Sequence, residues 1–272
     1  MHAVVFVKQV PDSTEVRIDP RTNTLMREGV PSIINPYDAH AVEEAVRLKE
    51  RFGGKVTVIS MGPPQAREVL KRSISFGADV GVLVTDRAFG GSDTLATSYI
   101  LSQALRKVAE QEPVDIVLAG KQAIDGDTAQ VGPGIATRMG WPQLTYVMNI
   151  ISVDPDKREI VVERKLEGGK EIVKARLPVL LTVEKGINEL RYATFPNLLR
   201  AARYEVTMWG KDQLAVDPGK IGLKGSPTTV GRIFPPPPRE GGEKLPGGDD
   251  NPDQVAALLA DLLIKRNLIA DR

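Results

Sequence analysis

Four apolar runs in the first 120 residues predict the core of the fold. Each is short and almost continuously apolar, which is typical of strands buried on both faces of a parallel sheet. They cover residues 2–7, 55–60, 80–84 and 114–119. Segments with helical spacing of apolar side chains separate these runs, at residues 36–52, at 65–76 and after residue 94. Because such strands are joined by right-handed crossovers, we expect an α/β fold with a doubly wound, mostly parallel, Rossmann-like sheet.

The pattern of apolar and polar residues changes after residue 141. Stretches that alternate in polarity and are separated by turn residues predict strands that extend the sheet as antiparallel edge strands. They cover residues 144–153, 159–165 and 171–175, and residues 178–183 add a further, apolar strand to this extension. Nearer the N-terminus, residues 16–34 contain two short strand-like pieces and turn signals, which predict a small hairpin before the first helix.

Glycine and proline become frequent from residue 210 onward, so we place a domain boundary there. Residues 1–209 are expected to form the α/β domain and residues 210–272 an extended C-terminal arm. Residues 235–238 are four consecutive prolines, which favour polyproline II. The arm ends in an amphipathic helix at residues 252–267, whose apolar stripe needs a surface to pack on. We expect that surface to belong to a partner subunit, with the chain's own domain as the alternative.

Composition and charge exclude several classes of function. The 272 residues include 36 basic and 35 acidic side chains, and the net charge of +1 argues against a surface that binds nucleic acid. No apolar run is long enough to span a membrane, and residues 1–10 lack signal-peptide features. We therefore expect a cytoplasmic protein without direct membrane insertion. With no cysteine and only His2 and His40, a metal site and a catalytic residue are not expected, so redox chemistry would need a bound cofactor.

The candidate binding site follows the fourth apolar run. Gly120 and Gly126 allow sharp turns and a close approach to a ligand, and a short helix is predicted at residues 129–139. A strand, a glycine-bearing loop and a helix start together present free backbone N–H groups to an anion. Asp127 or Thr128 would cap this helix. The alternative is an ordinary strand-to-helix turn, since the loop matches neither standard glycine-rich phosphate motif.

The segments after the other core strands point to the same place. In a doubly wound sheet, ligands bind beyond the carboxyl ends of the strands. Lys8, Met61 and residues 86–94 should therefore meet residues 120–131 at one edge. Within residues 86–94, two glycines precede Ser92 or Asp93 as an N-cap, which offers either a second anion site or simply a cap.

Residues 35–38 predict the start of the first helix. Asn35 is a favoured N-cap, and Pro36 fits the first helical position. Asp38 falls at the third helical position, where an acid is favoured by the helix dipole.

A cluster of apolar side chains precedes the arm. Tyr192, Phe195, Leu198 and Leu199 lie on a predicted loop and short helix at residues 191–202. An exposed patch of this kind suits the docking of a partner protein. The alternative, that these side chains cover the core, is equally consistent with the sequence.

A series of short motifs runs through the chain in a specific order. The motifs are Val7-Lys8-Gln9-Val10-Pro11, Asn35-Pro36-Tyr37-Asp38, Met61-Gly62-Pro63, Gly77-Ala78-Asp79, Gly120-Lys121-Gln122-Ala123-Ile124-Asp125, Gly126-Asp127-Thr128-Ala129-Gln130 and Arg191-Tyr192-Ala193-Thr194. Together they make the chain resemble, over essentially its whole length, the β (small) subunit of electron transfer flavoproteins. Residues 86–97, 126–133 and 232–235 resemble the bifurcating, Fix-type branch rather than the mitochondrial one.

The resemblance implies a heterodimer with an α (large) subunit. In ordinary members the β subunit holds AMP in a structural role, and the only FAD sits in the α subunit, which serves acyl-CoA dehydrogenases. In bifurcating members the same β-subunit site holds a second FAD. That flavin accepts a hydride from NADH and sends its electrons separately to a high- and a low-potential acceptor. Fix-type systems add a quinone-reducing flavoprotein and a ferredoxin-like protein as partners, which would bring the complex to the membrane surface.

The resemblance also implies the positions of the cofactor contacts. They are Phe6, Lys8, Asn35, Pro36, Tyr37, Asp38, Met61, Ala88, Phe89, Gly90, Ser92, Asp93, Thr94, Gly120, Lys121, Gln122, Ala123, Ile124, Asp125, Gly126, Asp127, Thr128, Ala129, Gln130 and Val131. For the FAD-holding branch, residues 88–94 should close over the remainder of the dinucleotide. The partner-recognition loop falls on residues 191–202, with Phe195 where ordinary members usually have leucine.

We therefore expect an electron-transfer β subunit that oxidises NADH at a bound FAD, and only in complex with its partners. One alternative is an ordinary β subunit that binds AMP, and another is an unrelated nucleotide-binding sensor. Residues 90–92 favour the FAD-holding subunit over the AMP-binding one, and the long arm argues against a sensor.

Overall fold

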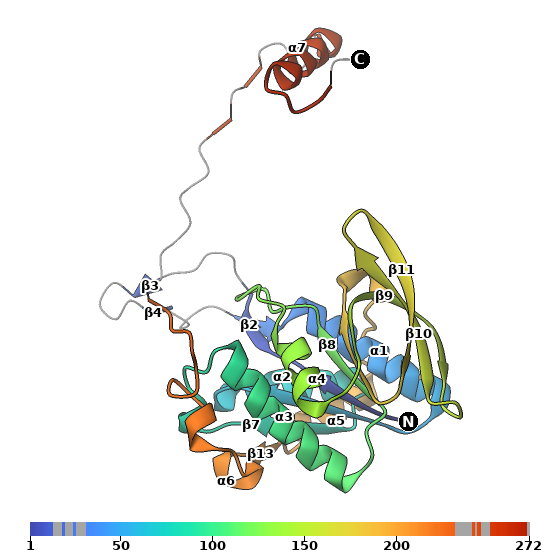
Figure 1. Cartoon of the computed structure of the whole chain (residues 1–272), viewed down its shortest axis with the longest axis vertical. Helices are drawn as coiled ribbons and strands as arrows, with labels where there is room; N and C mark the ends of the chain where they lie inside the picture. The colour runs from blue at the N-terminus through green and yellow to red at the C-terminus, as the bar shows by residue number, and fades with distance from the viewer. Residues whose placement is uncertain are drawn as a thin grey trace. The chain divides into compact units, whose positions relative to one another are not determined.

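The computed structural model describes residues 1–12, 31–231, 241–242, 244–245 and 251–270, together with the backbone of residues 18–19 and 24–25. Contacts divide the chain into two units, Met1–Ile233 and Phe234–Arg272 (Figure 1). The rise in glycine and proline predicts that the arm starts at residue 210. Residues 210–231 belong by their contacts to the first unit, because Leu214 and Ile221 are buried in its core.

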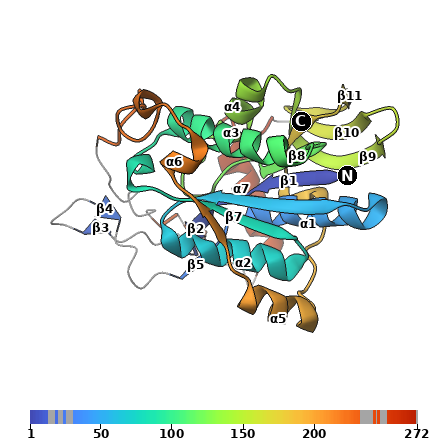
Figure 2. The ribbon, with the colours of Figure 1, turned by 90° about the horizontal axis from the view of Figure 1, so that it is seen from below.

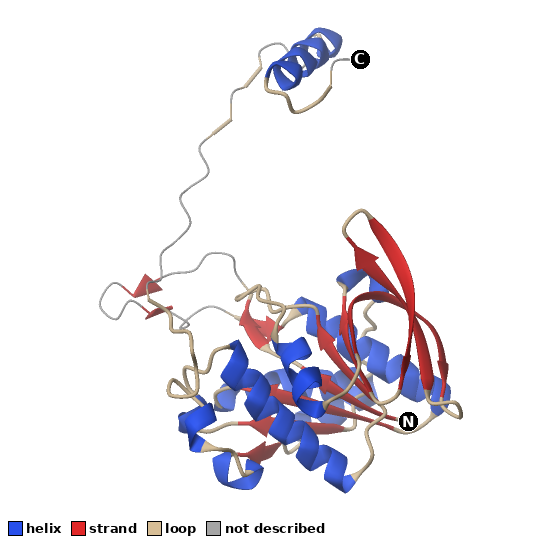
Figure 3. Cartoon of the chain, in the orientation of Figure 1, coloured by secondary structure: helices blue, strands red, loops and turns tan. Residues whose placement is uncertain are grey.

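The first unit is built on one mixed sheet. Among the described residues it has nine strands, in the order β11-β10-β9-β12-β8-β1-β6-β7-β13. Figure 3 shows the strands in red and the helices in blue. Their bounds are β1 His2–Phe6, β6 Lys55–Met61, β7 Val80–Val84, β8 Ile116–Gly120, β9 Gln143–Asp154, β10 Glu159–Leu166, β11 Gly169–Arg176, β12 Val179–Val183 and β13 Thr207–Trp209. In this order, each strand from β9 through β12, β8, β1, β6 and β7 to β13 pairs in parallel with the next. At the other end, β10 pairs antiparallel with both β9 and β11.

Helices cover both faces of this sheet. Figure 2 shows α1 and α2 on one face and α3 and α4 on the other, with α5 beside α2. Their bounds are α1 Pro36–Phe52, α2 Arg67–Phe76, α3 Thr94–Gln111, α4 Val131–Met139, α5 Phe195–Arg203 and the short α6 Lys211–Leu214. Successive side chains of β1 enter opposite layers, Val4 on the α3 side and Val5 on the α1 side. This sandwich confirms the predicted doubly wound α/β fold.

The edges of the sheet differ from the sequence prediction in two respects. Residues 178–183 were expected in an antiparallel edge strand, but β12 lies inside the sheet and pairs in parallel with both β8 and β9. The strand β13 was not predicted at all. It has three residues, too few for an alternating pattern, and it forms because its backbone pairs with β7.

The predicted excursion near the N-terminus is present in part. Strands β3 Ile18–Asp19 and β4 Thr24–Leu25 pair antiparallel, as do β2 Gln9–Pro11 and β5 Ser32–Ile34. The rest of residues 13–30 lies outside the described residues.

The second unit contains the predicted amphipathic helix as α7, Pro252–Lys265. Asn251 caps it through a hydrogen bond from the backbone N–H of Gln254. The four prolines at 235–238 and the motif at 232–235 lie outside the described residues. Within the described ranges, no helix has the length and apolar character that a membrane span requires.

Candidate functional site

A cleft of about 800 Å³ lies beyond the carboxyl ends of β1, β6 and β8 and beside the loop that follows β7. The candidate cofactor residues that line it are Phe6, Lys8, Asp38, Met61, Phe89, residues 92–94, residues 120–123, Asp125, Gly126 and residues 128–131. The candidates that do not line it are Asn35, Pro36, Tyr37, Ala88, Gly90, Ile124 and Asp127. The parallel sheet thus brings loops from four parts of the chain to one edge, as the fold rule predicts.

Asp38 connects two of the central strands at the base of the cleft. Its Oδ2 accepts a hydrogen bond from the backbone N–H of Lys8 (2.8 Å), and its Oδ1 accepts one from the N–H of Gly120 (3.0 Å). Burial raises the pKa of Asp38 from 3.8 to about 7, although the hydrogen bonds act in the opposite direction. A Cβ atom on Gly120 would lie 2.3 Å from Oδ1, so only glycine fits there.

Asn35 supports the loop after β8 rather than the helix it begins. It occupies the N-cap position of α1, but its side chain makes no capping hydrogen bond. Instead its Nδ2 donates to the carbonyl oxygen of Gln122 (2.9 Å), and its Oδ1 accepts from the N–H of Ile124 (3.2 Å). The side chain is fully buried. The prediction of a side-chain cap was therefore wrong, because Asn35 supplies partners to backbone groups of the loop.

The helix after this loop begins later than predicted. Neither Asp127 nor Thr128 caps it: α4 starts at Val131, and its N-cap residue is Gln130. Asp127 and Ala129 have φ angles of +50° and +54°, in the left-handed region, so a right-handed helix cannot include them.

The first turn of α4 is open toward the cleft. Gln130 makes no side-chain capping hydrogen bond, and both Val131 and Gly132 line the cleft. The carboxylate of Asp127 accepts a hydrogen bond from Nε2 of Gln122 (2.6 Å), which keeps it within the loop. The unpaired N–H groups of a first helical turn favour an anion, so this is the stronger of the two candidate phosphate positions.

The second candidate position is a capped helix start. Asp93, not Ser92, caps α3: its Oδ1 accepts from two N–H groups of the first turn at 2.9 and 3.0 Å. Burial acts to raise the pKa of Asp93, but hydrogen bonds from that turn and from Thr228 outweigh it and lower the pKa below its ordinary value. An ionised carboxylate therefore occupies the place of an anion. Thr94 Oγ1 donates to Oε1 of Gln130 (2.8 Å), which joins this loop to the loop after β8.

Two lysines of the candidate set are already paired. Lys8 Nζ lies 2.7 Å from the carboxylate of Asp125 at the rim of the cleft. Lys121 Nζ lies 3.2 Å from Glu184 and 5.2 Å from the centre of the Tyr146 ring. In this arrangement a phosphate in the cleft would be held by backbone N–H groups rather than by a lysine.

Several cleft residues were missed by the sequence analysis. Apolar side chains of Ile59, Ala66, Leu101 and Ile135 contribute to its walls. Ile59 lies near the end of a predicted strand, so the fold rule alone could have included it. Val230 also lines the cleft, and no local signal in the sequence indicates that a residue after 210 reaches it.

The candidate partner-docking residues are at the surface. The exposed fractions are 96% for Tyr192, 71% for Phe195, 44% for Leu198 and 43% for Leu199. The alternative in which these side chains cover the core is therefore wrong for the chain as it stands. They form an apolar patch on α5 and the loop before it.

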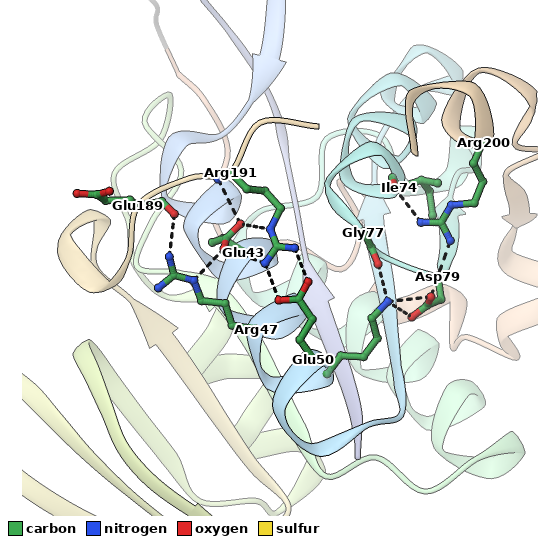
Figure 4. Close-up of polar contacts among 10 residues, drawn as sticks. Glu43, Arg47, Glu50, Ile74, Gly77, Asp79, Glu189, Arg191 and Arg200 are labelled. Atoms are coloured by element: carbon green, nitrogen blue, oxygen red, sulfur yellow. Dashed lines mark hydrogen bonds and ion pairs between the residues drawn. The ribbon is translucent and has the colours of Figure 1, made fainter. Parts of the chain in front are cut away.

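Basic side chains hold this segment against α1 and α2 (Figure 4), while its apolar side chains stay exposed. Arg191 Nε donates to buried Glu43 at 2.8 Å, and the same guanidinium also reaches Glu50 of α1. Burial acts to raise the pKa of Glu43, but Arg191 and Arg47 outweigh it and lower that pKa. Arg200 donates to two backbone carbonyls near the end of α2, at 2.8 and 3.0 Å.

No group of three or more histidine, aspartate or glutamate side chains within the described residues is placed to hold a metal ion. The two histidines are engaged elsewhere. His2 is hydrogen-bonded to Thr57 and His40 to Asn188.

Comparisons with known proteins agree with the fold. A family model described as the electron transfer flavoprotein domain matches residues 22–214. The chain is 54% identical to "Protein FixA" of Azotobacter vinelandii over 265 residues, which cover 96% of this chain and 94% of that protein. It is 46% identical over 273 residues to "Electron transfer flavoprotein subunit beta" of Megasphaera elsdenii, covering 99% of this chain and 100% of that protein. For the protein of the same name from Thermoanaerobacterium thermosaccharolyticum, the identity is 48% over 270 residues, with coverage of 99% and 100%.

Proposed function

The chain belongs to the electron transfer flavoprotein family, as a β subunit of the FixA type, and we propose that its cleft binds an FAD that accepts a hydride from NADH. In this proposal the electrons leave separately for a high- and a low-potential acceptor. The chemistry of hydride acceptance and single-electron transfer would come from the flavin, and the chain would bind, orient and shield it.

The size and the walls of the cleft support this proposal most directly. At about 800 Å³ it lies in the upper part of the range of roughly 300–1,000 Å³ that is usual for small-molecule sites. Its walls extend from the first turn of α4 to residues 91–94 after β7. A mononucleotide would need only the part of the cleft beside β1, β6 and β8. A dinucleotide would use that part and also the part beside residues 91–94.

The residues of the cleft have separate tasks in the proposal. Open N–H groups at Val131 and Gly132 would hold a phosphate. Backbone groups of Phe6 and Met61 would meet the edge of the adenine, while the N–H of Lys8 is already donated to Asp38. Apolar walls would exclude water from the flavin, which strengthens the remaining electrostatic interactions.

No side chain of the cleft is needed as an acid, a base or a nucleophile. The chain has no cysteine, and neither of its two histidines, both in the described part of the chain, lines the cleft. This matches a subunit whose reaction is carried by a cofactor and by electron transfer to partners.

One observation favours the alternative, an ordinary β subunit that binds AMP in a structural role. Asp93 caps α3, so a second phosphate cannot use that helix start unless the carboxylate moves. A single phosphate on α4 is what a mononucleotide needs.

We propose that the chain works in a heterodimer with an electron transfer flavoprotein α subunit, on which the arm and α7 dock. The patch of Tyr192, Phe195, Leu198 and Leu199 would receive a further redox partner, either a quinone-reducing flavoprotein with a ferredoxin-like protein or an acyl-CoA dehydrogenase. The complex would work in the cytoplasm, at the membrane surface where the partner requires it.

An anaerobic titration of the purified αβ complex with NADH tests the proposal. We expect NADH to bleach the flavin absorbance when the amount added is close to the amount of FAD in the cleft, since that FAD would accept the hydride directly. A complex whose flavin absorbance is unchanged by NADH, and which is reduced only by another donor protein, would contradict the proposal.

A further inference from the structure

Residues 222–228, called here the strap, lie against the loop at residues 88–94. The two segments lie 130 to 135 positions apart at the residues that join them, yet hydrogen bonds link them directly. Gly222 donates its N–H to Oγ of Ser92 (3.0 Å), and Oγ of Ser226 accepts from the N–H of Asp93 (2.8 Å). Thr228 donates both its N–H (3.1 Å) and its hydroxyl (2.8 Å) to Oδ2 of Asp93.

The two backbones approach so closely that side chains are excluded at the crossing. Gly91 has a φ of +75°, and a Cβ there would lie 2.5 Å from Cδ2 of Leu223. Gly222 has a φ of +59°, and a Cβ there would lie 2.4 Å from the carbonyl oxygen of Ala88. Glycine is needed on both sides for conformation and for space. This gives the second glycine of the loop a packing role that does not depend on a ligand.

Asp93 is the residue through which the strap acts on the helix. One carboxylate oxygen caps α3, and the other accepts both hydrogen bonds of Thr228. Because the two oxygens belong to one rigid group, fixing the second also fixes the direction of the first. The strap therefore sets the position of the loop at the point where Ser92 and Asp93 line the cleft.

We propose that the strap holds the loop at residues 88–94 closed against the cleft, with Ser226 and Thr228 as positioning residues for the bound nucleotide. Val230, two residues beyond Thr228, itself lines the cleft. Loss of the strap's hydrogen bonds would free the loop and speed the release of the nucleotide, although neither Ser226 nor Thr228 lines the cleft. The identity of that nucleotide as FAD rests on the proposed function.

The test uses the αβ complex with a double variant, Ser226→Ala with Thr228→Val. These substitutions remove the hydrogen bonds of the two hydroxyl groups to Gly91 and Asp93, together with the bond from Ser226 to the Gly222 carbonyl, and keep the backbone N–H of residue 228. Thr229→Val is the matched control, because Thr229 is exposed and makes no hydrogen bond to a described residue of the loop. Two quantities are measured: amide hydrogen exchange across residues 88–96, and the dissociation constant of FAD.

We expect faster exchange at residues 88–96 and FAD binding weakened by about five- to twentyfold in the double variant, from the loss of the hydroxyl hydrogen bonds between strap and loop. The control should behave like the parent. Unchanged exchange would overturn the proposal, and so would faster exchange with unchanged FAD affinity. If the parent complex holds AMP and no FAD, the proposed function fails, and the strap is then judged by the same exchange data with AMP affinity.

Discussion

Asp38→Asn tests how the base of the cleft is held together. Asparagine has the shape of a protonated aspartate and keeps one acceptor for Lys8 or Gly120, but it carries no charge. In the parent, the folded pKa of about 7 lies above the ordinary value of 3.8 because the carboxyl is buried. The folded chain therefore binds this proton more tightly than the unfolded chain does. The parent keeps this contribution fully below pH 3.8 and loses it as the pH rises through 7.

The size of the effect follows from that difference in pKa. A difference of about 3 corresponds to roughly 4 kcal/mol over the whole titration, at about 1.4 kcal/mol per pKa step. Between pH 5 and pH 8.5 the parent should lose about 2–3 kcal/mol that Asp38→Asn does not lose. The variant should thus be less stable than or equal to the parent at pH 5, gain on it as the pH rises through about 7, and gain little more toward pH 8.5.

The assay is urea unfolding of the full chain, followed by circular dichroism at five pH values between 5 and 8.5. Asp212→Asn is the control, because it removes the same charge from an exposed position. The quantity compared is the difference in apparent free energy of unfolding between each variant and the parent. A difference for Asp38→Asn that stays constant with pH would refute the reasoning, since it would mean that burial does not hold the proton there.

Three further predictions concern other parts of the first unit. Gly120→Ala should cost about 2 kcal/mol or more by overpacking against Asp38, whereas Gly126→Ala, with nothing within 4 Å, should be nearly neutral; equal thermal midpoints would contradict this. Arg191→Met should lower the free energy of unfolding by about 2 kcal/mol at pH 7. Because Arg191 lowers the pKa of Glu43, this stabilisation is present above pH 4.5 and is lost as the pH falls. An equal loss at pH 7 and pH 4 in urea titrations would argue against this explanation. Phe195→Ser should weaken binding of the redox partner about tenfold or more with an unchanged melting temperature, and unchanged affinity in a surface-binding assay would exclude a docking role.

The sequence predicts the core strands and the loops that follow them better than it predicts the hydrogen-bond partners of single side chains. The strands β1, β6, β7 and β8 and the helices between them follow from apolar periodicity, because that pattern is local. Strand β13 could not be predicted, since its three residues owe their conformation to pairing with β7.

The candidate site shows the same limit. Asn35 was correctly placed at the start of α1, but its side chain bonds to residues 122 and 124, almost ninety positions away. Asp38 likewise serves the ends of two strands. The sequence places Gly91 before an N-cap or a second anion site, and only the structure shows that it packs against Leu223. Local rules indicate that a polar side chain needs a hydrogen-bond partner or that a glycine is required. Long-range packing decides which residue supplies that partner or contact.

The nucleotide content of the purified αβ heterodimer tests the central proposal most directly. Released flavin is measured by absorbance and released AMP by chromatography, each per heterodimer. We expect two FAD and no AMP per heterodimer. One FAD with one AMP would contradict it, and the chain would then be an ordinary electron-transfer subunit without NADH chemistry of its own.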